Sequence, residues 1–101
     1  MINSLGEAKI VDFGLSTDTQ VSNYLYVRCG TPGFVAPEII TIRDNDSVKM
    51  SSISDVFSAG AVFYQMIFGK ALFDGKNNTD VLERNRRCLI TIPTSSDLAS
   101  F

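Results

Sequence analysis

Histidine is absent from this sequence, and only two cysteines occur, Cys29 and Cys88. A zinc site would need both thiols together with carboxylates, and their separation matches none of the usual ligand spacings. Residues 1–7, MINSLGE, lack the basic region and the apolar core of a signal peptide. Two distant cysteines without a secretion signal are expected to be free thiols in a reducing compartment. We therefore expect an intracellular, cytoplasmic protein that has no zinc site.

An excess of charge of either sign is also lacking, since 9 lysines and arginines face 11 aspartates and glutamates, for a net charge of −2. Basic side chains cluster only at Arg84, Arg86 and Arg87, where we expect a solvated helix end whose cations complement the helix dipole. Neither a nucleic acid nor a membrane surface is predicted as a partner. The most apolar stretch, residues 56–68, is well short of the roughly twenty residues of a membrane span.

The clearest structural element is an apolar stretch that is predicted to form a helix at about residues 54–68. Ser52 or Ser54 is the expected N-cap, and Gly69 suits the left-handed C-terminal stop. Apolar side chains occupy almost every side of this helix, which is typical of a helix surrounded by protein. A chain of 101 residues forms one small domain at most, and the rest of it has too few large apolar residues to cover the helix. The sequence thus predicts a central helix that lacks part of its packing partners.

Shorter elements are predicted on both sides of this helix. Residues 2–11 are interpreted as two short strands joined by a turn at Gly6, which gives a β hairpin. Pro37 suits the first turn of a brief helix that runs through Ile40, and Thr79 is the expected cap of a third helix. The expected fold class is therefore α+β, mainly α-helical, with a short β hairpin at the N-terminus.

Asp12-Phe13-Gly14 carries the first chemical signal. Magnesium prefers hard oxygen ligands, and Asp12 follows an apolar run at residues 8–11 that would deliver its carboxylate from a strand. Phe13 is expected to be buried, and Gly14 would let the backbone turn sharply after it. Such a tripeptide alone is a weak signal, for which an ordinary turn is the simpler interpretation. A second motif, CGTPGFVAPE at residues 29–38, changes that balance.

Together the two motifs resemble the activation segment of a serine/threonine protein kinase, here residues 12–38. The resemblance continues in SDVFSAG, which is similar to the start of the central helix of the kinase C-lobe, although Phe57 stands where most relatives have tryptophan. Residues 69–76 resemble the loop that follows this helix. Residues 81–85 resemble the next helix of kinases in the calcium/calmodulin-dependent group.

The resemblance implies that residues 1–101 are a partial kinase domain, a fragment of the C-lobe. The N-lobe with its glycine-rich loop and ATP-binding lysine is missing, and so is the catalytic loop with its catalytic aspartate. ATP and magnesium are implied as cofactors only in the complete parent domain, which transfers the ATP γ-phosphate to serine or threonine hydroxyls of a protein substrate. The isolated chain is predicted to be inactive, because phosphoryl transfer needs several groups acting together.

The same resemblance assigns roles near the cofactor and the substrate. Asp12 would bind magnesium and act in catalysis, with Phe13 and Gly14 beside it in the cofactor-binding motif. Thr31 would lie in the substrate-docking loop and contact the catalytic aspartate. The alternative for Thr31 is a simple Thr-Pro turn.

Two acidic residues have structural roles in kinases that resemble this chain. Glu38 would pair with an arginine of a later helix, and Asp55 would accept hydrogen bonds from the backbone of the catalytic loop. Within this chain alone, Glu38 would instead be solvated. Asp55 would then be a charge at the start of a helix, stabilised by the helix dipole.

Regulation by phosphorylation is less clearly indicated. Val27 stands where many relatives carry an activating threonine, and only Arg28 lies near enough in the sequence to pair with a phosphate. The candidate acceptors are the hydroxyl residues of the intervening stretch: Thr17, Thr19, Ser22, Tyr24 and Tyr26. Each of them is equally described as a solvated loop residue.

Three hypotheses for the chain remain open. It is a fragment of a serine/threonine kinase, a non-catalytic kinase-like binding module, or a non-functional remnant. Its expected partners are a protein substrate and either the missing part of the kinase domain or another protein that covers the central helix. Coding sequence upstream of Met1 would discriminate the first two hypotheses, since an open frame that encodes a catalytic loop supports the kinase fragment.

Overall fold

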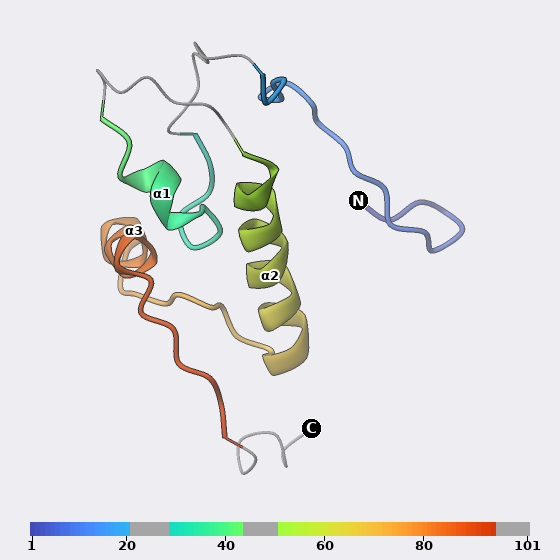
Figure 1. Ribbon diagram of the computed structural model, residues 1–101. Helices are drawn as coiled ribbons and strands as arrows, with labels where there is room; N and C mark the ends of the chain where they lie inside the picture. The colour runs from blue at the N-terminus through green and yellow to red at the C-terminus, as the bar shows by residue number, and fades with distance from the viewer. Residues whose placement is uncertain (21–28, 44–50, 95–101) are drawn as a thin grey trace.

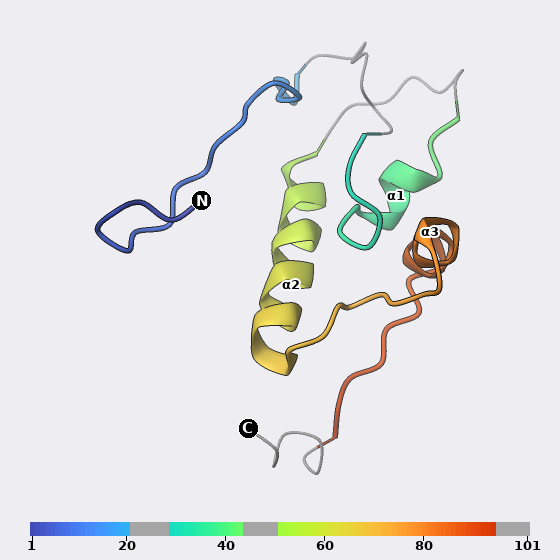
Figure 2. The ribbon, with the colours of Figure 1, turned by 180° about the vertical axis from the view of Figure 1, so that it is seen from behind.

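The computed structural model describes residues 1–20, 29–43 and 51–94. Its radius of gyration is 15.7 Å, larger than the ~13 Å expected for a compact domain of this length. Both views show residues 1–20, hereafter the N-terminal arm, reaching away from the helices (Figures 1 and 2). The chain therefore consists of a helical body and an extended arm.

The arm forms its one bridge near the N-terminus. Ile2 and Ala8 form one isolated antiparallel bridge. The side-chain oxygen of Asn3 accepts from the backbone N–H groups of Leu5 and Glu7 at 3.0 and 2.9 Å, which closes a tight loop between the two bridge partners. Backbone bonds flank this bridge, from the Asn3 N–H to the Glu7 carbonyl at 2.9 Å and from the Lys9 N–H to the Met1 carbonyl at 2.8 Å. The predicted hairpin of two strands is nevertheless wrong, because the pairing ends at Met1 and Lys9 with a single bridge and the described residues form no strand.

The described residues of the body form three helices: α1 (Pro37–Ile40), α2 (Ser52–Phe68) and α3 (Asn78–Arg87). Helices α1 and α3 pack against each other on the same side of α2 in both views (Figures 1 and 2). Among the described helices, none is both long and apolar enough to cross a membrane.

Helix boundaries follow from local capping groups. Pro37 begins α1 as predicted, and Gly69 ends α2 in the left-handed conformation with φ of 68°. The predicted N-caps are wrong. Ser51 caps α2 by accepting from the Ile53 N–H at 3.2 Å, and Asn77 caps α3 by accepting from the Asp80 N–H at 2.9 Å. Ser51 lies one residue before Ser52, the nearer of the two expected caps of α2, and Asn77 lies two residues before Thr79, the expected cap of α3.

A small core lies between α1 and the N-terminal half of α2. Its buried members are Ala36, Ile39 and Ile42, and Val35 and Phe57 pack against them. The Phe57 ring also stacks on Phe73, with centroids 6.4 Å apart and an angle of 13° between the planes. This cluster fixes the N-terminal half of α2 against α1.

The opposite face of α2 has no such cover. More than half of each side chain is exposed for the following large apolar residues of this helix: Ile53, Val56, Phe63, Met66 and Ile67. We refer to this set as the open face of α2. Its exposure confirms the expectation that the central helix lacks part of its packing partners within the described residues.

Candidate functional site

The second sequence motif forms a loop, residues 29–36, that lies between α2 and α3. Asn85 of α3 holds one side of this loop. Its Oδ1 accepts from the Gly33 N–H at 3.0 Å, and its Nδ2 donates to the Val35 carbonyl at 2.7 Å. Asn85 is 0% exposed, so its bond to Gly33 is buried and its bond to Val35 is partly buried. A buried backbone group left without a partner would be costly.

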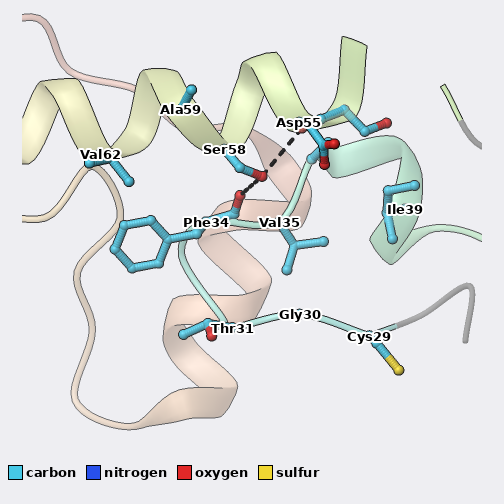
Figure 3. Close-up of a pocket in the computed structure, with 12 residues that line it drawn as sticks. Cys29, Gly30, Thr31, Phe34, Val35, Ile39, Asp55, Ser58, Ala59 and Val62 are labelled. Atoms are coloured by element: carbon cyan, nitrogen blue, oxygen red, sulfur yellow. Dashed lines mark hydrogen bonds between the residues drawn. The ribbon is translucent and has the colours of Figure 1, made fainter. Parts of the chain in front are cut away.

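Ser58 of α2 holds the other side of the loop. Its hydroxyl donates to the Phe34 carbonyl at 2.7 Å and also lies 3.3 Å from the Ser54 carbonyl (Figure 3). Phe34 is also tied back within the loop, because its N–H donates to the Thr31 carbonyl at 3.1 Å. The backbone of the loop is thus bonded to both neighbouring helices.

Glu38 lies in the first turn of α1, next to this loop. Its carboxylate Oε1 accepts from the hydroxyl of Ser54 at 2.8 Å, and Ser54 is buried on α2. Hydrogen bonds to charged groups are stronger than those between neutral groups. Glu38 is therefore a link between α1 and α2 rather than a merely solvated side chain.

A groove of about 510 Å³ lies between the loop and the N-terminal half of α2 and is lined by residues of both. We call it the α2 groove, and its lining includes Thr31, Phe34, Asp55, Ser58 and Val62 (Figure 3). Thr31 is exposed, and Asp55 lies exposed in the first turn of α2 where the helix dipole favours a negative charge. The structure therefore brings two of the predicted site residues, Thr31 and Asp55, to one groove.

A second groove of about 300 Å³ lies on the α3 side of the same loop. We call it the α3 groove. None of its lining residues has a polar side chain: Gly30, Pro32, Val35, Ile39, Ile40 and Leu82. Gly30, Val35 and Ile39 also line the α2 groove, so the shape of one loop sets the walls of both.

The first motif lies apart from these grooves, in the N-terminal arm (Figures 1 and 2). Asp12 has a left-handed backbone with φ of 66°, and its Oδ1 accepts from the Gly14 N–H at 3.4 Å. The expected burial of Phe13 is wrong, because its side chain is 67% exposed. The turn is closed instead by Ser16, whose N–H and hydroxyl both donate to the Phe13 carbonyl at 3.0 and 2.7 Å.

The phosphorylation candidates are only partly within the described residues. Thr17 is half-buried and its hydroxyl lies 3.5 Å from the Asp18 carbonyl, whereas Thr19 is exposed. Ser22, Tyr24 and Tyr26 lie outside the described residues, as do Val27 and Arg28.

The exposed face of α3 carries the clearest electrostatic feature. Arg86 donates from Nε and Nη2 to the two carboxylate oxygens of Glu83, at 2.9 and 2.6 Å. This bonding lowers the pKa of Glu83 and raises the pKa of Arg86. Arg84, Arg86 and Arg87 occupy the last turn of α3, which confirms the prediction that they mark a helix end.

Comparison with known proteins assigns this chain to a family. The sequence profile of the protein kinase domain matches residues 1–100. The chain belongs to the protein kinase domain family. It is 32% identical over 93 residues to SNF1-related protein kinase catalytic subunit alpha KIN12 of Arabidopsis thaliana, a match that covers 92% of this chain and 18% of that protein.

Two further relatives are similar in extent. The chain is 34% identical over 92 residues to probable serine/threonine-protein kinase 2 of Plasmodium falciparum, which covers 91% of this chain and 17% of the relative. It is 40% identical over 74 residues to sperm motility kinase 2B of Mus musculus, which covers 73% of this chain and 14% of the relative. The kinase-domain chain thus spans less than a fifth of the length of these relatives.

Asp12 fits a magnesium site as one ligand among several. Its carboxylate is exposed, and the one described bond to it is long, which leaves most of its oxygen acceptor capacity available. No cluster of three or more His, Cys, Asp or Glu side chains that could hold a metal occurs in residues 1–20, 29–43 and 51–94. A single carboxylate still agrees with magnesium chemistry, since magnesium bound with ATP uses few protein ligands and several phosphate and water oxygens.

Sequence reasoning missed Asn85 and Ser58, the two side chains that hold the loop. A partial signal existed for Asn85. It follows Val81 by one helical turn, so both lie on the same face of α3, and Val81 is half-buried. This spacing places Asn85 on the face of α3 that packs against the loop, but it does not identify the groups that Asn85 bonds to. For Ser58, which lies within an apolar helix, the sequence gives no sign of which carbonyl it reaches.

Proposed function

We propose that this chain is a C-lobe segment of a serine/threonine protein kinase that transfers the γ-phosphate of ATP to protein hydroxyls. The observation that carries the proposal is the match of residues 1–100 to the protein kinase domain. The names of its relatives include a probable serine/threonine-protein kinase, which supports this choice of acceptor. Similarity at residues 81–85 supports a place near the calcium/calmodulin-dependent group.

Each site residue has a role in this proposal. Asp12 is a magnesium ligand in the motif that it forms with Phe13 and Gly14, and bound magnesium would neutralise charge on the ATP phosphates. Thr31 belongs to the loop on which the substrate peptide docks. Asp55, which lines the α2 groove, accepts hydrogen bonds from the backbone of the catalytic loop.

The 101 residues alone are proposed to be inactive. Phosphoryl transfer depends on positioning and on charge neutralisation by several groups at once. The arm that carries Asp12 and the groove that holds Thr31 and Asp55 lie apart in this structure (Figure 1). Activity therefore requires further chain that brings the two parts together around ATP.

Phosphoamino-acid analysis of a degenerate peptide library tests the proposal. The full-length protein that contains this chain would be incubated with radiolabelled ATP, magnesium and the library. We expect label on serine and threonine, because residues 30–32 resemble the docking loop of serine/threonine kinases. Predominant phosphotyrosine would refute the acceptor class, and no transfer at all would refute the enzymatic proposal.

A second candidate function is a non-catalytic binding module. The open face of α2 favours it, because exposed apolar surface of this kind marks an interaction site. The coding sequence upstream of Met1 discriminates the two candidates. An open frame encoding a His-Arg-Asp catalytic loop supports the kinase, and an in-frame stop codon supports the module.

A further inference from the structure

One buried side chain is bonded to the loop that both grooves share. Asn85 is the largest fully buried side chain among the described residues, and its amide satisfies one donor and one acceptor of the loop backbone. Its partners, Gly33 and Val35, are 52 and 50 positions away in the sequence. These two bonds therefore join α3 to a distant segment of the chain and depend on how α3 packs against the loop.

Gly33 shows how closely the loop approaches α3. Its φ is 97°, a conformation that side-chain-bearing residues rarely adopt, and a Cβ there would lie 3.3 Å from Cγ1 of Val81. Val81 and Asn85 are neighbours on one face of α3. The loop thus contacts α3 at Gly33, which has no side chain, and through the Asn85 amide, which bonds to Gly33 and to Val35.

We propose that Asn85 is a positioning residue that sets the shape of the 29–36 loop and thereby the affinity for the peptide substrate. The peptide part of this inference rests on the proposed kinase function. Val35 lines both grooves, and its carbonyl is the acceptor of the Asn85 amide. Loss of that bond would move a wall of both grooves at once, while the magnesium ligand Asp12 lies on a different segment.

The test measures peptide and ATP kinetics in the full-length protein. Asn85→Leu keeps a similar volume but removes both hydrogen bonds. We expect the KM for the best serine peptide of the library to rise about tenfold or more, with the KM for ATP changed by less than about twofold. An unchanged peptide KM, or an equal rise of both KM values, would overturn the inference.

Asn77→Ala is the matched control. Asn77 caps the same helix through the Asp80 N–H but does not contact the loop in the described bonds. This substitution weakens α3 without removing the Asn85 bonds. We expect its peptide KM to stay within about twofold of the wild type. An equal rise in both variants would show that Asn85 acts only through helix stability.

Two further measurements keep the inference testable if Asn85→Leu does not fold or the wild type is inactive. The Gly33 N–H should exchange slowly with deuterium in the folded wild-type protein, since it is bonded to a buried amide. Fast exchange at Gly33 would overturn the positioning role whether or not the protein is a kinase.

Gly33→Ala disturbs the same contact between the loop and α3 from the loop side, and it should raise the peptide KM as Asn85→Leu does. An unchanged peptide KM in Gly33→Ala would also overturn the inference. If no transfer is observed with the wild type, the peptide part of the inference fails together with the proposed function.

Discussion

The N-terminal arm and the 29–36 loop each carry one of the two motifs that resemble a kinase activation segment, but different contacts hold them. Hydrogen bonds in the arm, such as those from Met1 to Lys9 and from Gly14 to Asp12, join residues 8 and 2 positions apart. The loop is held by side chains of α2 and α3, and the Asn85 bonds span 50 and 52 positions. Substitutions in the arm should therefore change chemistry with little change in stability. Substitutions around the loop should mainly lower the free energy of unfolding.

The largest expected effect is on catalysis, from Asp12→Asn in the arm of the full-length protein. A neutral amide binds magnesium poorly, so phosphoryl transfer should fall more than about tenfold, a loss of at least ~1.4 kcal/mol in transition-state stabilisation. The melting temperature should be nearly unchanged, because the Asp12 side chain has only one weak local bond in the described residues. A radiolabelled ATP assay and a thermal melt measure the two quantities. A variant that kept its rate would show that Asp12 is not the metal ligand, and a large fall in melting temperature would break the contrast between arm and loop.

The next effect is on the stability of the body, from Gly75→Ala before α3. A Cβ at Gly75 would lie 2.7 Å from the Asp80 Cβ and 2.9 Å from the Val81 backbone nitrogen. Either the backbone around Gly75 or the start of α3 must shift, at a cost of about 1–3 kcal/mol in the free energy of unfolding. Urea unfolding of the full-length protein measures it. Lys76→Ala, at the adjacent exposed position, is the control and should stay within about 0.5 kcal/mol of the wild type. Equal stability of the two variants would contradict the close packing at Gly75.

A smaller loss is expected from Ser54→Ala, which removes the hydrogen bond to Glu38 between α1 and α2. We expect about 1 kcal/mol, because the acceptor is charged but lies on an exposed residue. A double-mutant cycle with Glu38→Ala isolates the pair. Additive losses in the double variant would show that the two side chains do not stabilise each other, and the link between α1 and α2 would then rest on apolar packing alone.

The smallest effect concerns Glu83 and Arg86 on the exposed face of α3. The Arg86 hydrogen bond lowers the pKa of Glu83 below its ordinary value of 4.5. A carboxylate with a lowered pKa in the folded state contributes stability above its ordinary pKa and loses it as the pH falls through the lowered value. Glu83→Gln should therefore reduce the melting temperature at pH 7 and leave it unchanged in strong acid. The reduction should be slight, because solvent screens this exposed pair. A difference that grew on acidification would contradict the assigned direction.

The sequence predicted the elements that depend on local signals. Pro37, Gly69 and the apolar run before it located α1 and the end of α2, because helix starts and stops are local. The true caps, Ser51 and Asn77, were missed because adjacent serine, asparagine and threonine residues satisfy the same pattern.

Long-range contacts account for what the sequence did not predict. Asn85 was missed because its partners are distant in the chain, and no local pattern indicates them. Burial of Phe13 was wrongly predicted, because burial depends on what packs around the arm and not on the motif itself. The incomplete cover of α2 was predicted, because the rest of the chain has too few large apolar residues to surround it, but which face is open was not.

Calorimetry of the purified 101-residue chain tests the central claim most directly, namely that the open face of α2 belongs inside a larger kinase domain. Ordering each residue costs on the order of 1 to 2 kcal/mol, which a small core with an uncovered helix does not offset. We predict a broad transition with an enthalpy far below the ~70 kcal/mol of a cooperative domain of this length. A sharp two-state peak near that enthalpy would contradict the account, because it would show that these residues form a complete cooperative core by themselves.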